Sequence, residues 1–380
     1  MKILILAYYN PWISGGGHRP ICLCEEDIAR GDEVVFLFES DAEIDQMKKF
    51  SLFNSHRLRL LRREKESGKL IAMNQQAEIF ETEDDILEKW RPDYIKSHNP
   101  VQSFLGILKK AKDKGIFHIY DQMDFWDGFP VQPWGKDVEK EYISMADQCI
   151  TISEWLAQKN RDITDKEFKV IPNAIKNAFA DKLFMSYEEV QERSKRKKKQ
   201  IIYSGAIWPE WFEMEIIEYL VEKFPEYEFL MLGPYLSCKD EDDGRNNVEI
   251  IRNLEHNFNI KFLGQVPHEE LVSYLRQANL AIVPFVINEV TKACSPLKCF
   301  EYLGAFLPVI STNLPEIKNY PMIEFASSKA EFANKVEKMI EHKITENEYK
   351  MMCNFTEENT WKARSQEINK IIIDKNLARR

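Results

Sequence analysis

The interpretation of this chain begins with SPLKCFEYL (residues 295–303), followed closely by PVIST (residues 308–312). The pattern predicts a helix with a marked start and then a buried strand. Ser295 is a good N-cap, and Pro296 suits the first helical position, where its missing N–H costs nothing. Lys298 and Glu301 are three residues apart and therefore share one face of the predicted helix.

The start of this helix is suited to a phosphate. A helix N-terminus offers free N–H donors and a partial positive charge, to which Lys298 would add a full charge. Glu301, one turn deeper, would accept hydrogen bonds from the hydroxyls of the molecule that carries the phosphate. A nucleotide sugar would thus be held by its diphosphate and its ribose. An ordinary capped helix with a surface Lys–Glu pair explains these residues equally well.

Around this stretch, strand and helix patterns alternate along the whole chain. A length of 380 residues predicts two domains. The alternation predicts the α/β class, with two Rossmann-like doubly wound domains that face each other across a cleft. The predicted strands are 2–8, 33–38, 94–96, 116–120, 148–152, 168–171, 200–205, 227–232, 260–264, 280–284 and 308–312. We expect a first domain at 1–185, a basic linker at 186–199, a second domain at 200–354 and a final helix at 355–380.

Composition narrows the class of protein. A net charge of −10 argues against a general nucleic-acid binder. Seven cysteines without a Cys-x-x-Cys pair or a His/Cys array predict reduced thiols in a cytoplasmic protein. The apolar run at 2–8 is better explained as a buried strand than as a signal peptide, and no later run approaches the length of a transmembrane helix.

The first predicted strand leads into a glycine-rich turn. Three consecutive glycines at 15–17 precede a predicted helix at 21–30, and Gly16 and Gly17 are our candidates there for binding a diphosphate. The spacing is not Gly-x-Gly-x-x-Gly, so we do not expect a dinucleotide site. The alternative is a flexible loop.

Polar side chains follow two further predicted strands. Ligands of open α/β sheets bind at the carboxyl ends of the strands, where His98, Asp121 and Asp124 are expected. The His98 imidazole would bond a sugar hydroxyl or stabilise developing charge, and either aspartate would act on an acceptor hydroxyl as base or anchor. The alternatives are a structural histidine and aspartates that cap the next helix.

Residues 47–63 combine basic and aromatic side chains. Such a mixture predicts either peripheral contact with an anionic membrane surface, at the inner face of the membrane, or a solvated helix face.

The order of motifs resembles that of the GT-B glycosyltransferases, in particular the large retaining group called family 4, over nearly the whole chain. The matching motifs are PDYIKSH (92–98), TISEWL (151–156), VIPNA (170–174), FLGQVP (262–267) and the stretch at 295–312. The resemblance implies a nucleoside-diphosphate sugar (UDP-, GDP- or dTDP-linked) as co-substrate in the second domain. It implies a carbohydrate, lipid-linked or glycoconjugate acceptor that faces the first domain.

The resemblance also assigns further residues. Gly264, Val266 and Pro267 match the base-binding loop, and Thr360-Trp361 match the start of the helix that crosses back to the first domain. Additional candidates for the donor site are Gly205, Trp208, Pro296 and Leu297.

Several positions depart from the family pattern. Ala293 stands where the first carboxylate of Glu-x7-Glu is usual, and residues 206–211 replace a basic Arg/Lys pair. Ala174 and Phe306 each stand where glycine is usual. Lys298 and the helix N–H groups at Ser295 are then the main candidates to receive the charge of the departing diphosphate, helped by Lys292 or Arg19.

From these observations we expect a retaining hexosyltransferase in bacterial surface polysaccharide or glycoconjugate assembly, with His98 on the donor sugar. An Asp-x-Asp run at 240–242 is interpreted as a solvated loop, so we expect no required metal or other cofactor. The alternatives are a nucleotide-sugar epimerase on the same fold and a catalytically weak binding or scaffold subunit.

Overall fold

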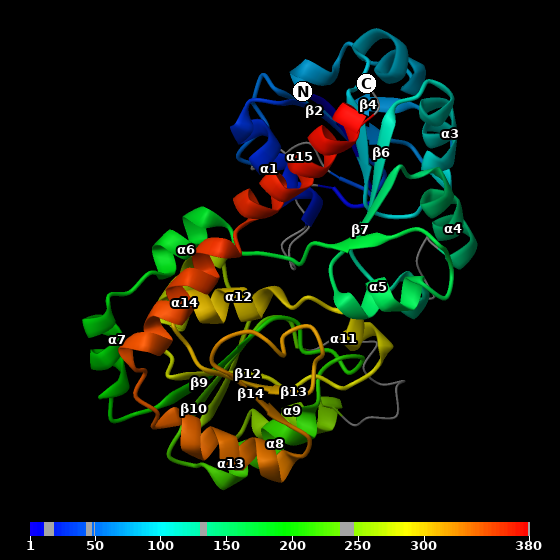
Figure 1. The fold of residues 1–380 in the computed structure, drawn as a ribbon. Coiled ribbons are helices and arrows are strands. Elements are labelled where there is room, and N and C mark those ends of the chain that lie inside the picture. The colour runs from blue at the N-terminus through cyan, green and yellow to red at the C-terminus, as the bar shows by residue number, and fades with distance from the viewer. Residues whose placement is uncertain (11–18, 43–47, 49, 130–134, 236–246, 379–380) are drawn as a thin grey trace. The chain divides into compact units, whose positions relative to one another are not determined.

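The computed structural model describes residues 1–10, 19–42, 48, 50–129, 135–235 and 247–378. The chain divides into two compact units, Met1–Pro172 with Arg364–Arg380 and Asn173–Ala363. Each unit is built on a largely parallel sheet with helices on both faces (Figure 1). The expected α/β class with two doubly wound domains is confirmed.

The sheet of the first unit has the order β4-β3-β2-β1-β5-β6-β7-β8. Neighbouring strands pair in parallel, except that β4 is antiparallel to β3. Its strands are β1 (Lys2–Ala7), β2 (Glu33–Phe38), β3 (Leu58–Arg63), β4 (Leu70–Ala72), β5 (Tyr94–Ser97), β6 (Phe117–Gln122), β7 (Gln148–Thr151) and β8 (Phe168–Val170). The central strand β1 is apolar because both of its faces are covered, as in other parallel sheets.

Helices cover both faces of this first sheet. Figure 1 shows α1 and α15 on one side and α3 and α4 on the other. The α-helices assigned to this unit are α1 (Arg19–Arg30), α3 (Leu105–Asp113), α4 (Lys136–Met145), α5 (Glu154–Asn160) and most of α15 (Trp361–Ala378). Shorter helical turns are Gln75–Ala77, Asp85–Trp90, Gln102–Phe104 and Trp126–Gly128.

The sheet of the second unit has the order β11-β10-β9-β12-β13-β14 and is parallel throughout. Its strands are β9 (Gln200–Ser204), β10 (Glu228–Leu232), β11 (Ile260–Gly264), β12 (Leu280–Val283), β13 (Val309–Thr312) and β14 (Ile323–Ala326). The chain reverses its strand order between β9 and β12, which is where doubly wound sheets bind their ligands.

Helices also cover both faces of the second sheet. Helices α8, α9 and α13 lie on one face, and α6, α12 and α14 lie on the other (Figure 1). The α-helices are α6 (Asn177–Leu183), α7 (Tyr187–Ser194), α8 (Met214–Lys223), α9 (Asn247–Leu254), α10 (His268–Gln277), α11 (Glu289–Ala293), α12 (Leu297–Gly304), α13 (Lys329–Ile340) and α14 (Glu346–Glu358).

The division between the units differs from the expected one. The second unit begins at Asn173, before residue 185, and the last residues grouped with the first unit begin at Arg364. The expected basic linker at 186–199 contains α7, whose N-terminus is closed by a capping box between Ser186 and Glu189. The basic run follows α7 directly, and its composition led us to predict a linker for the whole of 186–199.

Residues 58–63 form strand β3, so the helix that we considered for 47–63 is wrong for this part. Leu58, Leu60 and Leu61 are buried in the sheet. The arginines of β3 pair instead with carboxylates, as in Arg59–Glu33 and Arg63–Glu83. No helix in the described part of the chain is long and apolar enough to cross a bilayer. Contact of residues 47–63 with a membrane surface stays a prediction.

Phe306 occupies the position after α12 at which the family usually has glycine. Its φ is 56°, a left-handed conformation that costs an L-residue about 1–2 kcal/mol. Two contacts hold it there. Its ring stacks on Tyr349 with centroids 4.7 Å apart, and the buried Arg193 guanidinium donates to the carbonyls of Ala305 and Phe306. The side chain thus gains a packing role that glycine lacks.

A buried group of charges joins α1, β5 and α15 in the first unit. Asp27 accepts hydrogen bonds from Lys96, Arg30 and Ser365, and both Asp27 and Lys96 are almost completely buried. Because Lys96 has its carboxylate beside it, the two charges compensate each other in a region from which water is excluded.

We expect Asp27→Asn to destabilise the first unit by about 3–5 kcal/mol, because it leaves the Lys96 ammonium buried without a counter-charge. Hydrogen exchange of peptides from β1 and β5 in urea measures this loss. Asp41→Asn is the matched control. Asp41 is exposed and its pair with Arg62 spans 3.7 Å, so its removal should leave exchange nearly unchanged. Equal effects of the two substitutions would contradict the role given to Asp27.

Candidate functional site

The start of α12 differs in detail from the expected cap. The helix begins at Leu297, Pro296 occupies the N-cap position, and no side chain caps the helix. The Ser295 hydroxyl instead accepts a hydrogen bond from the backbone N–H of Asn173 at 3.1 Å, and the Ser295 carbonyl accepts one from Asn173 Nδ2 at 2.9 Å. Ser295 therefore fixes the Pro-Asn segment against the helix, and its cap role was wrong.

Lys298 lies one turn into α12 in an aromatic cage. Its ammonium is 4.3 Å from the ring centroid of Tyr203 and 4.4 Å from that of Phe285, and it donates to the Tyr203 hydroxyl at 2.9 Å. Among the described residues, no carboxylate lies within ion-pair distance of this nitrogen. Burial lowers the pKa of Lys298 to about 8. The cage thus holds a cation that lacks a counter-charge.

Three glycines end the neighbouring strands β9, β10 and β11. Gly205, Gly233 and Gly264 all have positive φ, at 139°, 130° and 65°. Gly205 donates its N–H to Leu232, and Gly233 donates to the carbonyl of Gly264 at 2.7 Å. A Cβ on Gly233 would lie 2.1 Å from the Gly205 carbonyl oxygen, and a Cβ on Gly205 would lie 2.8 Å from the Lys298 ammonium. Only glycine fits this approach of backbone to backbone and of backbone to lysine.

Glu301, one turn after Lys298 in α12, contacts the start of α10. Its Oε1 lies 3.3 Å from Nε2 of His268, which directly follows Pro267, the N-cap of α10. The His268 ring stacks on Phe179 with centroids 3.9 Å apart. These contacts join the segment 264–268, the strand end at Gly205 and the α12 pair Lys298 and Glu301 into one continuous cluster, which we call the α12 cluster.

The sequence interpretation missed three members of the α12 cluster, namely Tyr203, Phe285 and His268. Tyr203 and Phe285 read as ordinary core residues of two strands, and only the fold shows that they meet Lys298. His268 had a local signal, since it follows the predicted base-binding loop at once. Its partner Glu301 is 33 residues away.

The loop at 206–211 carries aromatic side chains in place of the missing basic pair. Trp208 is 37% exposed, and its ring lies 5.2 Å from that of Trp211. The Trp211 indole N–H and the Tyr203 hydroxyl both donate to the Ala206 carbonyl. The loop is thereby tied to the aromatic cage, but it brings no cation to it.

In the first unit, His98 and Asp121 lie at the carboxyl ends of β5 and β6. Asp121 is fully buried, and Nε of Arg19 donates to both of its oxygens, at 2.9 and 2.8 Å. Nδ1 of His98 lies 3.2 Å from Asp121 Oδ2. The Arg19 charge helps to hold the pKa of Asp121 at about 2, against the effect of burial. Both oxygens of Asp121 therefore already accept a hydrogen bond, and the Arg19 guanidinium already pairs with a carboxylate.

Asp124 differs from Asp121, because it is half-buried and forms no ion pair with any of the described residues. Burial alone raises its pKa to about 7. The phenol of Tyr9, half-buried in the same unit, has its pKa raised to about 12 by burial and by the charge of Asp124. Gly16, Gly17 and the acidic run at 240–242 lie outside the described residues.

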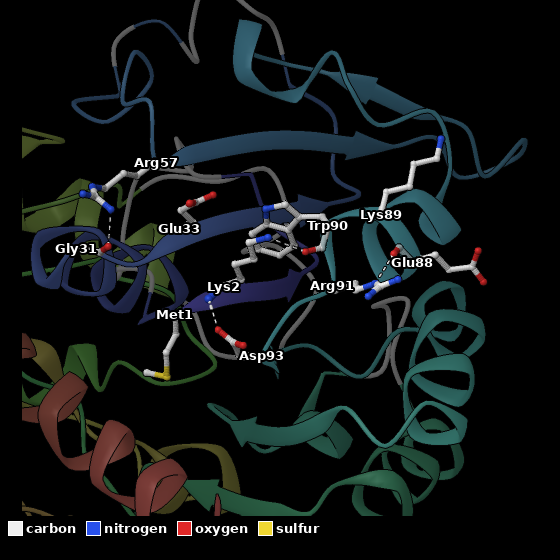
Figure 2. A pocket seen from close by; sticks show the side chains of 10 residues that line it. All are labelled: Met1, Lys2, Gly31, Glu33, Arg57, Glu88, Lys89, Trp90, Arg91 and Asp93. Carbon is white, nitrogen blue, oxygen red and sulfur yellow. Dashed lines mark hydrogen bonds between the residues drawn. The ribbon is translucent and has the colours of Figure 1, made fainter.

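The first unit also has an open hollow of about 640 Å³ at the amino ends of β1, β2 and β5. Figure 2 shows Lys2 and Trp90 near its centre, with Arg57 and Lys89 farther out. These cations are bound within the protein: Lys2 donates to the Trp90 carbonyl, Arg57 to the Gly31 carbonyl, and Lys89 pairs with Asp85. The hollow lies at the opposite sheet edge from His98 and Asp121, so it is separate from the predicted site. In the described part of the chain, no group of three metal-ligating side chains is present.

Family models match most of the chain in two parts. A model described as Glycosyltransferase Family 4 matches residues 14–178, and one described as Glycosyl transferases group 1 matches residues 198–342. The chain is a family 4-like glycosyltransferase. The resemblance drawn from the sequence motifs is thereby confirmed.

A relative and several solved structures are similar to this glycosyltransferase. A Bacillus subtilis protein named as a teichuronic acid biosynthesis glycosyltransferase, TuaH, is 26% identical over 184 residues, which are 47% of this chain and 44% of that protein. The match thus spans less than half of the relative. Sucrose-phosphate synthase from Thermosynechococcus elongatus has a TM-score of 0.69 at 15% identity, covering 99% of each chain. Anabaena HepE in complex with UDP has a TM-score of 0.68 at 15% identity, covering 98% of this chain and 100% of that one. These likenesses show the GT-B fold.

The glycine contacts lead to a test of the α12 cluster. Gly233→Ala should destabilise the second unit by about 3 kcal/mol or more, because the new methyl meets a backbone carbonyl at an unfavourable φ. Gly264→Ala, at the next strand end, has open space around its Cβ and should cost about 1–2 kcal/mol. Hydrogen exchange of β9 and β10 in urea compares the two. A Gly233→Ala protein as stable as Gly264→Ala would show that the strand ends do not approach as described.

Proposed function

We propose that this glycosyltransferase moves a hexose from a nucleoside-diphosphate donor to a hydroxyl of a carbohydrate, lipid-linked or glycoconjugate acceptor. We propose retention of configuration, which the family resemblance supports. We also propose a role in surface polysaccharide or glycoconjugate assembly, which the similarity to the teichuronic acid protein supports, and a location on the cytoplasmic side of the membrane. A nucleotide-sugar donor is supported by fold neighbours solved with UDP and with UDP-glucose.

The observation that carries this proposal is the uncompensated Lys298 ammonium in its aromatic cage. Lys298 is half-buried, and a partly buried cation without a carboxylate in contact lowers stability; a diphosphate would supply the missing charge. Cleavage of the sugar–phosphate bond leaves further negative charge on the diphosphate, so a preorganised cation stabilises the transition state more than the ground state.

The remaining roles follow the positions of the side chains. Glu301 would hold the ribose, and the segment Gly264–Pro267 would hold the base. Gly205, with Pro296, Leu297 and the backbone at Ser295, would face the diphosphate, and Trp208 would border the donor. His98 would contact the sugar, and Asp124 would take the proton of the acceptor hydroxyl. Gly16 and Gly17 remain candidates for the diphosphate.

The departures from the family pattern favour one rival, a binding subunit with weak catalysis. Ala293 is buried at the end of α11, where the usual first carboxylate is absent, and the loop at 206–211 adds no cation. Transfer of radiolabelled sugar to acceptor extracts decides between the two. Tight nucleotide binding without any transfer would support the binding subunit, and turnover of nucleotide sugar without an acceptor would support an epimerase.

We expect Lys298→Met to weaken UDP binding about 10- to 100-fold, the effect of losing a charge-assisted hydrogen bond. It should also raise the melting temperature of the free protein, because Met fills the cage without a buried charge. Wild-type affinity should fall as pH rises above about 8, where Lys298 loses its proton. Calorimetry and thermal shift measure both effects; UDP at 100 times its Kd should stabilise the wild type by about 2.7 kcal/mol.

The matched control for this prediction is Lys261→Met. Lys261 is a lysine of the same unit, exposed and paired with Glu228. Its substitution should change neither UDP affinity nor its pH dependence. If Lys298→Met also leaves both unchanged, the donor site is not at Lys298.

We expect Asp124 to set the acidic limb of the pH–rate profile. Its raised pKa means that the carboxylate is protonated, and unable to accept a proton, below pH about 7. The kcat/KM for the acceptor should therefore rise as pH increases through about 7. Asp124→Asn should lower this parameter by about 10²- to 10⁴-fold and abolish the limb. Asp127→Asn, at an exposed site three residues on, should change neither, and an unchanged limb in Asp124→Asn would exclude this role.

A further inference from the structure

Asp121, Arg19 and His98 form a buried chain of contacts in the first unit. Each of the three side chains is at least nine-tenths buried. Arg19 Nε bonds both carboxylate oxygens, and Arg19 Nη1 also donates to the Pro172 carbonyl at 3.2 Å. Arg19 is therefore held at two points, the Asp121 carboxylate and the Pro172 carbonyl. The carbonyl is itself fixed, because it also accepts a hydrogen bond from Arg364 Nε at 3.0 Å. The carboxylate is therefore fixed in position and faces Nδ1 of His98.

The charges around His98 decide which ring nitrogen carries the proton. Asp121 is ionised, because Arg19 and His98 hold its pKa low, and an ionised carboxylate accepts hydrogen bonds only. Burial, together with the charges of Lys96 and Arg19, lowers the pKa of His98, so the ring is neutral near pH 7. A neutral ring with Nδ1 at 3.2 Å from a carboxylate oxygen places its single proton on Nδ1. Among the described residues neither ring nitrogen makes a hydrogen bond of regular geometry, but only Nδ1 lies beside a carboxylate oxygen, so Nε2 carries the lone pair and is left without a partner.

We propose that Asp121 is a positioning residue that, backed by Arg19, fixes His98 as the Nδ1–H tautomer and so presents a bare Nε2 as a hydrogen-bond acceptor. Resting on the function proposed above, the group that Nε2 would accept from is a hydroxyl of the donor sugar. His98 then orients the sugar and cannot deliver a proton from Nε2. This replaces the earlier expectation that Asp121 acts on the acceptor.

A second buried histidine in the same pair of strands provides an internal reference. His118 is in β6, and its Nε2 lies 2.7 Å from the Ser97 hydroxyl. Burial lowers the pKa of His118 to about 3, so it also stays neutral. The His118 ring bonds Ser97 and not Asp121. A local change at Asp121 should therefore move the His98 signals and leave those of His118 in place.

The test is long-range ¹H–¹⁵N NMR of the full chain labelled with ¹⁵N-histidine, with His98→Gln to assign the signals. We expect wild-type His98 at pH 7 to be neutral, with Nδ1 protonated and Nε2 bare. In Asp121→Asn, Arg19 will retain the amide oxygen, and the amide NH₂ will face Nδ1. The His98 proton should then move to Nε2, the opposite tautomer. Arg19→Lys, which removes the guanidinium fork but retains a charge, should produce a mixture of the two tautomers.

Two results would overturn the proposal: a wild-type His98 protonated on Nε2, or an Asp121→Asn protein whose His98 tautomer is unchanged. The first result is measured on the wild-type protein, so the proposal can be tested even if Asp121→Asn does not fold. Asp147→Asn is the matched control, because Asp147 accepts a hydrogen bond from the backbone N–H of His118. It should leave both tautomers unchanged.

A kinetic measurement separates this proposal from the proposed function. If the sugar is the ligand of Nε2, Asp121→Asn should lower kcat by about 10- to 100-fold, as measured for partners that orient a ligating histidine. Its affinity for UDP alone, which carries no sugar, should remain that of the wild type. Equal losses of kcat and UDP affinity would contradict a positioning role. If no nucleotide sugar is turned over at all, the proposed function fails while the NMR result still decides the tautomer.

Discussion

The second unit is organised around a lysine ammonium that has aromatic faces as neighbours and, in the part of the chain that the structure describes, no carboxylate within ion-pair distance. Lys298 reaches this position because Gly205 lacks a side chain and because Tyr203 and Phe285 lie near the carboxyl ends of the adjacent strands β9 and β12. The cage attracts the cation through ring quadrupoles, which are weaker than a full counter-charge. The free protein therefore retains an electrostatic cost at this point, of the kind that functional sites commonly carry.

In the first unit, by contrast, two buried cations are each paired with a carboxylate. Lys96 has Asp27, and Arg19 has Asp121, as a carboxylate in contact. Such pairs contribute specificity of position more than net stability. Arg193 in the second unit is an intermediate case, because backbone carbonyls replace the carboxylate and burial lowers its pKa to about 9. The contrast distinguishes charges that build the fold from the charge that is left for a ligand.

Most of the architecture could be predicted because parallel strands leave a local signal, an apolar run between helical patterns. The runs at 33–38 and 260–264 match β2 and β11 at both ends. Residues 58–63 were not interpreted as a strand, since arginine stems obscure the buried leucines of β3. We expected Asp121 to act on the sugar acceptor, because its partner Arg19 is 102 residues away and no local sequence pattern indicates that the two residues pair. Lys298 and Glu301 were identified from helix spacing, but their surroundings come from strands distant in sequence.

The helix α15 has a consequence for how the molecule is made. Because Arg364–Arg380 is grouped with Met1–Pro172, the first unit combines residues that precede the second unit in the sequence with residues that follow it. Asp27 can accept its hydrogen bond from Ser365, and the Pro172 carbonyl its bond from Arg364, only after these later residues have been synthesised. The second unit, continuous from Asn173 to Ala363, has all of its residues earlier. Domains usually fold during translation from the N-terminus onward. Here the second unit has all of its residues before the first unit does, so the order of the two units is reversed.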